Sequence, residues 1–415
     1  MKLLIINIKE LVQVRSQLSG SVKGKQMSQL PTLENAWLYI EDGMIHSFGQ
    51  MSSLSSEIPG FYESDILDAK GKMVLPAWCD SHSHIVFAQW REHEFVDKIK
   101  GLTYEEIAKR GGGILNSAAR LQKMDEVQLY EQALKRVAEV ISYGTGALEI
   151  KSGYGLTLND ELKMLRVIRK LKETTPLTIK ATFLGAHAVP PEFKGRQNEY
   201  VNHVINDMLP RVADEKLADY VDVFCDKGFF TVDETARILE AAQKFGLKPK
   251  IHANELDYSG GVQVGVKYKA VSVDHLEISG DDEILALKES DTMPTLLPNV
   301  SFYLNIPFAP ARQMIDCGLP VALASDYNPG SSPSGNMQLV ISLACIKYKM
   351  FPEEAINAAT INGAAAMEID HTHGSITPGK IANLIVLRDI PSLAYIPYSF
   401  GENNVYKMIL NGKEI

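Results

Sequence analysis

Cysteine is scarce in this sequence, and no two cysteines have the CxxC spacing of structural zinc or redox motifs. The 415 residues include four, Cys79, Cys225, Cys317 and Cys345. This usage disfavours a disulfide-bonded secreted domain and favours a reducing, cytoplasmic location. The sequence also lacks any apolar stretch near the ~18 residues that cross a bilayer, which disfavours a membrane-spanning helix. We therefore predict a cytoplasmic protein with no membrane partner.

An excess of positive charge is also missing. The formal net charge is −9 and the pI is about 5.7. This balance argues against a nucleic-acid partner and against binding to an anionic membrane surface. It also means that an anionic substrate would have to be held by local basic groups.

Several well-known catalytic signatures are absent. The glycines at 111–113 fit neither the G-x-G-x-x-G dinucleotide fingerprint nor a P-loop, and no G-x-S-x-G elbow is present to support a serine nucleophile. These absences disfavour a dinucleotide-dependent dehydrogenase, a P-loop nucleotidase and an α/β-hydrolase.

The order of strand-like and helical segments predicts an α/β protein with three parts. Residues 1–76 hold short strand-like runs, residues 77–373 alternate strands with amphipathic helices, and residues 374–415 return to strand-like runs. Alternation implies parallel strands with right-handed crossovers, and eight or nine strand candidates favour a (β/α)8 TIM-type barrel. We expect the two chain ends to pair, so that one small composite β-domain is built from both.

Helix boundaries are predicted from capping residues. Asn159 and Asp233 precede amphipathic stretches and are expected to be N-caps, whereas Gly246 follows one and is expected at the C′ position.

His82 and His84 are separated by one residue at the end of a predicted buried strand. Side chains at i and i+2 share one face of a strand, so two imidazoles can reach one metal ion. His252, His275 and Asp326 each follow another short apolar run. Because active-site groups of a barrel collect at the carboxyl ends of its strands, these five residues predict one cluster.

A second H-x-H pair, His371 and His373, lies in a polar segment bounded by glycine. We interpret this pair as part of a surface turn.

Several longer motifs resemble the imidazolonepropionase family of the amidohydrolase superfamily. They occur in the expected order from about residue 70 to the C-terminus: DSHSHIVF, GGGILNSA, EIKSGYG, TFLGAHAVPPE, DVFCDKGFF, IHANE, VDHLE and ASDYNPGSSPSGNMQ. The resemblance implies a barrel with a small composite β-domain, one catalytic metal ion and a homodimer.

The resemblance also implies the ligands of the metal. They are one divalent ion per chain, Zn²⁺ or Fe, held by His82, His84, His252 and Asp326. Such an ion lowers the pKa of bound water and polarises a carbonyl group, so that metal-bound hydroxide can attack a ring amide. Lys151 lies on a predicted strand and is interpreted as a hydrogen-bonded structural group, although a second metal held there stays an alternative.

Three residues are candidates for catalysis. Glu255 can accept a proton from water and deliver it to the leaving nitrogen, with orientation of a metal ligand as the alternative role. His275 can stabilise the oxyanion, unless it is only a buried core histidine. Asp326 is a second candidate for the first proton, and the sequence leaves the choice between Asp326 and Glu255 open.

The resemblance implies a substrate with a propionate and makes Arg91 the candidate anchor for it, which suits a guanidinium because this group binds a carboxylate through two parallel hydrogen bonds. Its alternative is a surface ion pair with Glu92 or Glu94. The resemblance adds further substrate-binding candidates: Tyr104, Tyr154, His187, Asn328, Gly330 and Ser331. The loop that carries the last three is expected to present backbone N–H groups to a carboxylate.

Two segments depart from the pattern of the family. Ala88-Gln89-Trp90 replaces a small glycine-containing turn just before Arg91, and Asn254 stands where aspartate is usual. Trp90 therefore puts the shape of the substrate loop in doubt.

The resemblance implies the function, which is hydrolysis of a cyclic amide, 4-imidazolone-5-propanoate, to N-formimidoyl-L-glutamate in histidine degradation. One alternative is deamination of a neutral heterocycle, against which a carboxylate anchor argues. Another is a catalytically inactive metal-binding or ligand-sensing protein, against which the complete ligand set argues.

Overall fold

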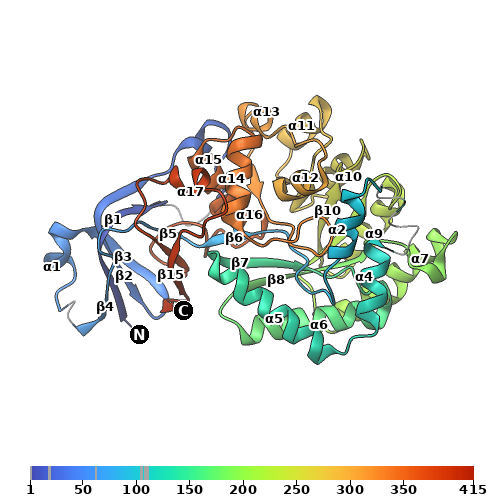
Figure 1. Cartoon of the computed structure of the whole chain (residues 1–415), viewed down its shortest axis with the longest axis horizontal. Coiled ribbons are helices and arrows are strands. Elements are labelled where there is room, and N and C mark those ends of the chain that lie inside the picture. The colour runs from blue at the N-terminus through green and yellow to red at the C-terminus, as the bar shows by residue number, and fades with distance from the viewer. Residues whose placement is uncertain (1, 17–19, 61–62, 103–105, 107–111) are drawn as a thin grey trace.

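A parallel barrel and a mixed β-sheet make up the molecule (Figure 1). The computed structural model describes residues 2–16, 20–60, 63–102, 106 and 112–415. In the view of Figure 1 the mixed sheet lies on the left, with the first strands beside β15 from the end of the chain.

Eight strands form the barrel, and every neighbouring pair is parallel. They are β6 (Trp78–Asp80), β7 (Thr145–Lys151), β8 (Thr178–Ala186), β9 (Tyr220–Cys225), β10 (Lys248–Ala253), β11 (Ser272–His275), β12 (Met293–Leu296) and β13 (Ala322–Leu323). The chain just beyond β6 and β13 closes the circle, since Asp326 N donates to His82 O at 2.9 Å and His84 N donates to Tyr327 O at 2.9 Å. The predicted TIM-type barrel is confirmed.

Helices connect the strands and cover the outside of the barrel (Figure 1). Those between β6 and β9 are α2 (Glu92–Ile99), α4 (Gly113–Gln122), α5 (Glu126–Ser142), α6 (Leu158–Thr174), α7 (Gln197–His203) and α8 (Leu209–Asp214). Those between β9 and β13 are α9 (Val232–Lys244), α10 (Gly261–Lys267), α11 (Asp281–Lys288), α12 (Pro298–Leu304) and α13 (Ala311–Asp316). After β13 come α14 (Met337–Lys347), α15 (Pro352–Ala359) and α16 (Ile361–Ala366).

The mixed sheet joins both ends of the chain. Its order is β16-β15-β14-β5-β1-β2-β3, with β4 beside β1. The N-terminal strands are β1 (Lys2–Val12), β2 (Thr32–Glu41), β3 (Met44–Gln50), β4 (Asp65–Asp68) and β5 (Val74–Pro76), and the C-terminal ones are β14 (Leu384–Leu387), β15 (Val405–Leu410) and β16 (Lys413–Glu414). Antiparallel pairing of β14 with β5 joins the two groups, and Ile5, Val74 and Leu384 share one apolar core. The pairing of the chain ends is confirmed. Two short helices, α1 (Leu54–Glu57) and α17 (Tyr395–Tyr398), lie outside the barrel connections.

Two predicted helix caps are wrong by two residues. Thr157 caps α6 and Thr231 caps α9, each with a side-chain oxygen that accepts from the N–H three residues on, whereas Asn159 and Asp233 lie inside the first turn. Aspartate and asparagine suit a first turn as well as a cap, so composition alone did not separate the positions. Gly246 has φ +77° just after α9, as predicted for a C′ glycine.

The cap of α9 gives a test of local stability. Thr231 and Glu234 form a reciprocal capping box in which Thr231 N donates to Glu234 Oε2 at 2.9 Å. Thr231→Ala removes the oxygen that accepts from the helix, so we expect the free energy of unfolding to fall by about 1 kcal/mol. Chemical denaturation followed by circular dichroism measures it. Thr231→Ser keeps the oxygen and should match the wild type; an equal loss in both variants would contradict the capping role.

The second H-x-H pair is only partly at the surface. His371 is exposed, but His373 is buried and its Nε2 lies 2.9 Å from Thr178 Oγ1. The prediction of a turn holds, but only His371 lies at the surface. His373 lies beside the start of β8, at the opposite end of that strand from its carboxyl terminus.

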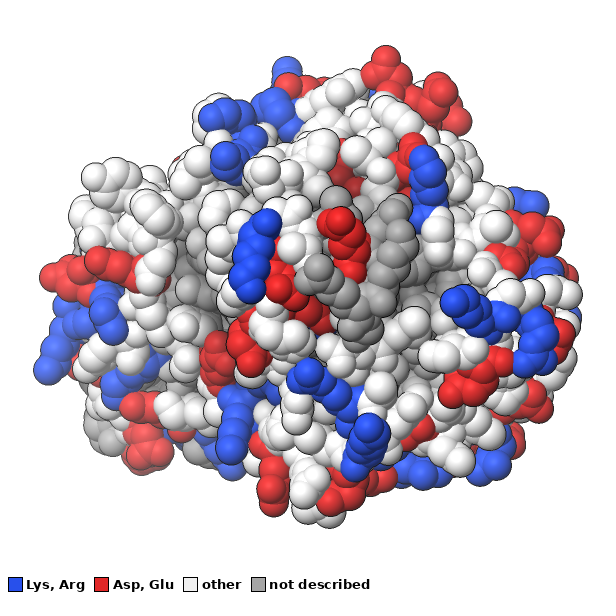
Figure 2. All heavy atoms as spheres, turned by 45° about the vertical axis from the view of Figure 1, so that its right-hand side comes forward, with Lys and Arg blue, Asp and Glu red and all other residues white. Residues whose placement is uncertain are grey.

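Positive and negative side chains are mixed on the face shown in Figure 2, where Lys and Arg alternate with Asp and Glu. Within the described part of the chain, none of the helices has the length and hydropathy needed to cross a membrane.

Candidate metal centre and active-site cavity

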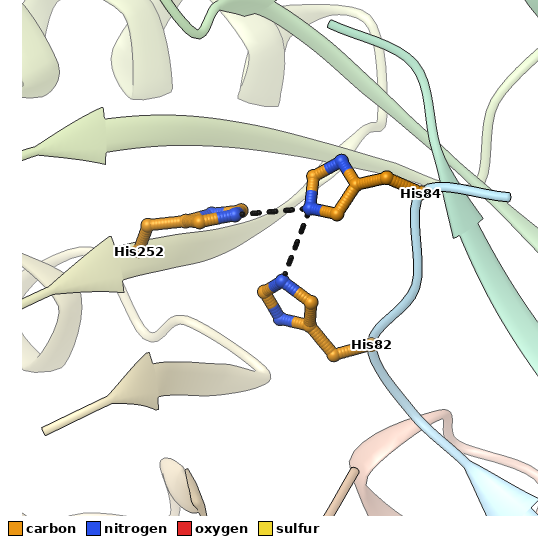
Figure 3. A group of neighbouring side chains, drawn as sticks. All are labelled: His82, His84 and His252. Atoms are coloured by element: carbon orange, nitrogen blue, oxygen red, sulfur yellow. Dashed lines mark hydrogen bonds between the residues drawn. The ribbon is translucent and has the colours of Figure 1, made fainter. Parts of the chain in front are cut away.

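Three imidazoles converge at the carboxyl end of the barrel (Figure 3). His82 and His84 follow β6, and His252 lies on β10. His84 Nε2 lies 3.2 Å from His82 Nε2 and 3.3 Å from His252 Nε2. All three side chains are buried.

Two of these histidines are held in a defined tautomer by carboxylates beneath them. His82 Nδ1 lies 2.6 Å from Asp274 Oδ2, and His252 Nδ1 lies 3.0 Å from Asp222 Oδ1. A carboxylate accepts at these distances, so each Nδ1 carries the proton and each Nε2 directs a lone pair at the centre. Burial, aided by the charge of Lys151, lowers the pKa of His82 well below its usual value, which keeps the imidazole neutral.

Asp326 completes a set of donors that fits a metal ion. Its Oδ1 lies 3.3 Å from His82 Nε2 and 3.4 Å from His84 Nε2. Zn–N bonds of about 2.0–2.1 Å in a tetrahedron place neighbouring ligand atoms about 3.3 Å apart, which matches these separations. Neutral imidazoles and a carboxylate also suit zinc and iron. His82, His275 and Asp326 form a second group of donor atoms close enough to hold an ion.

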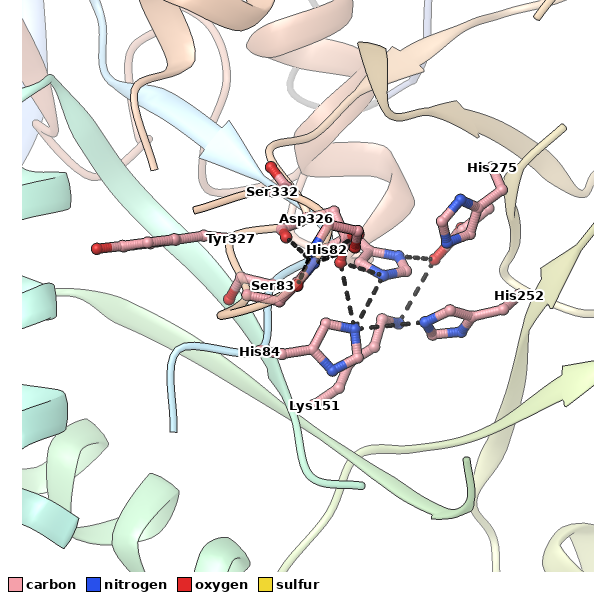
Figure 4. Close-up of polar contacts among 12 residues, drawn as sticks. His82, Ser83, His84, Lys151, His252, His275, Asp326, Tyr327 and Ser332 are labelled. Carbon is pink, nitrogen blue, oxygen red and sulfur yellow. Dashed lines mark hydrogen bonds and ion pairs between the residues drawn. The ribbon is translucent and has the colours of Figure 1, made fainter. Parts of the chain in front are cut away.

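A buried network of charges supports the histidines (Figure 4). Lys151 Nζ lies 2.6 Å from Glu149 Oε1, 2.8 Å from Asp222 Oδ2 and 3.4 Å from Asp274 Oδ2. Lys250 pairs with the other oxygen of Glu149. Lys151 therefore neutralises both carboxylates that orient the histidines, and the acids hold its pKa above the usual value although burial opposes them. This contact pattern agrees with the structural interpretation of Lys151.

Acidic groups outnumber basic ones on the other side of the centre. His275 Nε2 lies 3.7 Å from Glu255 Oε2, and His275 Nδ1 lies 3.5 Å from Glu277 Oε2. Burial raises the pKa of Glu255 to about 7 and that of Asp326 to about 8. Burial alone would lower the pKa of His275, but Glu255 and Glu277 raise it to about 10. Because three acidic groups surround one imidazole, a bound cation would be attracted to this region. The charge of that cation would lower the pKa of Asp326.

Strained backbone occurs at three of the strand ends that carry the site. Asn254, His275 and Asp326 all have positive φ, at +57°, +84° and +50°. Side chains with a Cβ rarely adopt this region, and such residues cluster at functional sites. Asn tolerates it better than most residues, and Asn254 also donates from Nδ2 to Ile278 O at 2.8 Å, so the departure from aspartate is accommodated locally.

The histidines open into a cavity of about 500 Å³. Its lining includes the histidine site, with His84, His252, Glu255, His275 and Asp326. It also includes Arg91 and a group of residues in contact with one another, Glu94, Phe95, Lys98 and Tyr303, which we call the anchor end. The structure therefore brings the metal-binding candidates and the candidate carboxylate anchor into one space.

Arg91 is buried, with its side chain 8% exposed. Its Nε and Nη1 have no hydrogen-bond partner within the described ranges, and its nearest acid, Glu94 Oε2, lies 3.7 Å from Nε. The alternative of an ion pair with Glu94 therefore holds in part: the pair is present, but it is buried and not at the surface. A Cβ on Gly330 would lie 1.1 Å from Arg91 Nη2, so only glycine leaves room for the guanidinium.

The loop after Asp326 is tied internally. Asn328 Oδ1 accepts from Gly330 N and Ser331 N, each at 2.8 Å, and Asn328 Nδ2 donates to Asp326 Oδ2 at 2.9 Å. The expectation that the N–H groups of Gly330 and Ser331 are free for a carboxylate is wrong, because an asparagine at the start of such a loop captures them. The loop instead positions Asp326 and makes space for Arg91.

Two ring side chains stand between the ends of the cavity. His187 stacks on His84 with centroids 5.4 Å apart, and Tyr154 lies 5.4 Å from His187. His187 Nδ1 donates to Gly153 O at 2.9 Å, and burial lowers its pKa to about 3, so a neutral ring with its Nε2 as acceptor lines the cavity. Tyr104 lies outside the described residues.

Trp90 packs beside the loop that follows Asp326. Its ring lies 4.7 Å from Phe87 and 5.9 Å from Tyr327, and the Arg136 guanidinium lies over both Phe87 and Trp90. Arg136 also donates to Ile85 O and Phe87 O at 2.9 and 2.8 Å. The tryptophan thus forms part of the support of the segment that leads to Arg91.

Sequence reasoning assigned no role to Asp222, Asp274, Lys98 or Arg136. Asp222 and Asp274 lie in short strands that are buried along their whole length, and a charged residue in a fully buried parallel strand is a signal that could have identified them.

Comparisons with known proteins agree with this geometry. The amidohydrolase family profile matches residues 73–415. The chain is 57% identical over 415 residues to imidazolonepropionase of Christiangramia forsetii, covering 100% of both chains. It is 57% identical over 412 residues to imidazolonepropionase of Flavobacterium johnsoniae, covering 99% of both, and 41% identical over 414 residues to that of Geobacillus kaustophilus, covering 100% of this chain and 97% of the relative.

Solved structures with a similar fold are more distant in sequence. Guanine deaminase of E. coli superposes with a TM-score of 0.75 at 13% identity, covering 100% of this chain and 99% of the deaminase. The 5-methylcytosine deaminase of Klebsiella pneumoniae gives 0.73 at 17% identity, covering 100% and 97%. At these identities the likeness shows a shared fold and no more.

Proposed function

The chain belongs to the imidazolonepropionases of the amidohydrolase family, and we propose that it hydrolyses 4-imidazolone-5-propanoate to N-formimidoyl-L-glutamate, a step of histidine degradation. The reaction breaks a carbon–nitrogen bond in a cyclic amide. The water oxygen bonds to the ring carbonyl carbon, the bond from that carbon to the ring nitrogen breaks, and a proton from water ends on the nitrogen.

One observation carries the proposal: a single cavity joins a metal-binding donor set to a buried arginine whose Nε and Nη1 have no hydrogen-bond partner among the residues that the structure describes. A substrate with a carbonyl at one end and a carboxylate at the other matches both features. A neutral heterocycle would give the Arg91 guanidinium no charged hydrogen-bond acceptor beyond Glu94, which lies 3.7 Å from Nε, and a buried polar group without a hydrogen bond is costly.

The residues that would hold the ion are His82, His84, His252 and Asp326, with one divalent ion, zinc or iron, per chain. When bound, the ion supplies Lewis acidity, which lowers the pKa of water and polarises a carbonyl group. The chain supplies the geometry, because Asp222 and Asp274 keep the proton of each histidine on Nδ1 and leave Nε2 free.

Glu255 is the proposed proton carrier. Its carboxylate lines the cavity beside His275, and both oxygens of Asp326 are already engaged, Oδ1 with the histidines and Oδ2 with Asn328. Glu255 can accept the proton of the attacking water and then deliver it to the ring nitrogen as that bond breaks. His275, held as a cation by Glu255 and Glu277, is positioned to stabilise negative charge on the carbonyl oxygen.

The remaining candidates would position the substrate. We propose that His187 and Tyr154 contact the planar ring, that Arg91 binds the propionate, and that Asn328 with Gly330 and Ser331 shapes the loop between them. Tyr104 keeps its proposed contact with substrate on the resemblance alone.

Turnover tests the proposal directly. Purified protein of known metal content should convert 4-imidazolone-5-propanoate to N-formimidoyl-L-glutamate. The loss of the ultraviolet absorbance of the substrate measures the rate. Ammonia release from guanine or cytosine derivatives, without loss of imidazolone, would favour a deaminase instead.

Arg91→Met tests how the substrate is recognised. Losing a charge-assisted, bidentate contact costs about 2–4 kcal/mol, so we expect kcat/KM to fall by about 30- to 1,000-fold. Most of the loss should appear in KM, because the propionate is bound alike in the ground and transition states. The measurement compares wild type and variant on the natural substrate and on an analogue without the carboxylate. Equal losses on both substrates would mean that Arg91 is structural.

The remaining assignments follow from family and composition. We propose a cytoplasmic location, in keeping with four free cysteines. We also propose that residues 77–373 form the hydrolase barrel and that residues 1–76 and 374–415 form the small β-domain. The homodimer stays a prediction.

A further inference from the structure

A second cation reaches the anchor end of the cavity from α2. Lys98 Nζ donates to Gly330 O at 3.3 Å and lies 5.1 Å from the centre of the Tyr303 ring. Gly330 is also the residue against which the Arg91 guanidinium packs. Two positive side chains therefore meet at one glycine, and both line the cavity.

The local charges do not cancel. Glu94 is the acid at this end of the cavity within the described residues that line it, and its Oε1 already accepts from Gly113 N at 3.0 Å and Asn116 Nδ2 at 3.2 Å. Its Oε2 lies 3.7 Å from Arg91 Nε. Among the described residues that line this part of the cavity, Lys98 and Arg91 therefore outnumber the acids by one charge, in a chain whose net charge is −9.

The contacts of Lys98 orient its ammonium group and leave donor capacity for a ligand. A carbonyl oxygen and an aromatic face orient an ammonium, but neither neutralises it, and each occupies only part of its three-donor capacity. An anion that binds between Lys98 and Arg91 would form an ion pair with each of them. Burial lowers the pKa of Lys98, and the charge of Arg91 lowers it further, whereas Glu94 opposes them.

We propose that Lys98 is a specificity-determining residue that binds the substrate carboxylate together with Arg91. The inference rests on the proposed function and deepens it, because it explains how a site would select an anionic side chain over a neutral one of the same size. The Arg91 fork fixes the orientation of the carboxylate, and the Lys98 ammonium adds a second charge beside the same residue, Gly330.

Direct binding of two stable probes tests this role. The probes are 3-(imidazol-4-yl)propanoate and its uncharged amide, which differ only at the group that Lys98 would touch. With Lys98→Met we expect the Kd of the propanoate to rise about 10-fold and that of the amide to change less than twofold, as for loss of one charged hydrogen bond at a partly exposed site. Lys98→Arg keeps the charge and should remain within about threefold of wild type for both probes. Titration calorimetry on the metal-loaded protein gives both values.

Lys100→Met is the matched control. Lys100 lies two residues further along the same helix end, is 65% exposed and pairs with Asp97 at 3.8 Å. It should bind both probes like the wild type. If Lys98→Met weakens the propanoate and the amide equally, or weakens neither, Lys98 only ties α2 to the Gly330 loop and the inference is overturned. Lys98→Gln, which keeps a hydrogen-bond donor, replaces the methionine variant if that one does not fold.

Different results would contradict the proposed reaction and the proposed role of Lys98. If the wild type binds the propanoate in a Lys98-dependent way but does not consume 4-imidazolone-5-propanoate, the proposed reaction is wrong while the anion site stands. If the wild type consumes the substrate and kcat/KM is the same in Lys98→Met, the reaction stands and the role of Lys98 is wrong.

Discussion

His82→Ala is expected to lose bound metal and turnover together while the barrel still folds. The imidazole supplies one of four donor atoms that lie 3.2–3.4 Å from their neighbours, and alanine supplies none. Lewis-acid stabilisation is worth several kcal/mol, so kcat/KM should fall by about 10³-fold or more. Metal analysis after gel filtration, with the rate measured on the same sample, gives both quantities.

His371→Ala is the matched control for this variant, because His371 is an exposed member of the second H-x-H pair. It should keep both metal and activity. Full activity in a metal-free His82→Ala protein would contradict the site as a whole.

Asp274→Asn should have a smaller effect than His82→Ala. The amide still fills the space below His82, but it no longer favours the proton on Nδ1 as a carboxylate does. Replacing a residue that orients a metal ligand through a hydrogen bond lowers metal affinity or activity by about 10- to 100-fold. Titration of the metal-free variant with Zn²⁺ would measure the change, and an affinity equal to that of the wild type would mean that Asp274 serves only Lys151.

The barrel and its cluster could be predicted because both follow from chain periodicity. Alternation of strand and helix requires parallel strands, and the carboxyl ends of parallel strands lie on one side, so His82, His252 and Asp326 had to meet. Pairing of the chain ends followed from the return of strand-like runs after residue 374, since an unpaired edge strand would be exposed.

Details that depend on one hydrogen bond could not be predicted in the same way. Thr157 rather than Asn159 caps α6, because the register of the first turn is set by packing of the whole helix. Asn328 captures the N–H groups that composition suggested were free. Lys98 gained a role only when the fold placed it against Gly330, 232 residues away in the chain.

The choice between the two acids becomes sharper once their contacts are known. Oδ1 of Asp326 belongs to the donor set, and its Oδ2 accepts a hydrogen bond from Asn328. A proton on either oxygen would compete with one of these interactions. Glu255 lies 3.7 Å from His275 and lines the cavity, where the attacking water and the leaving nitrogen would lie. These contacts favour Glu255 for both transfers.

Glu255→Gln should therefore lower kcat by about 10²- to 10⁴-fold while metal stays bound, because the amide keeps the shape of the side chain but cannot accept the proton. Rapid-quench or steady-state rates at saturating substrate measure the loss, and metal analysis of the same sample shows that the donor set is intact. An unchanged kcat would assign the proton transfers to Asp326 and leave Glu255 as a group that orients His275.

The pH dependence of the same pair of proteins separates these roles further. Burial raises the pKa of Glu255 to about 7, so the carboxylate form that accepts a proton is lost as the pH falls below this value. Wild-type kcat should then decline on the acid side, approaching about tenfold per pH unit below pH 6. The residual rate of Glu255→Gln should lack this limb, since glutamine does not titrate. A variant that keeps the wild-type acid limb would place the titrating base elsewhere, with Asp326 as the group to replace next.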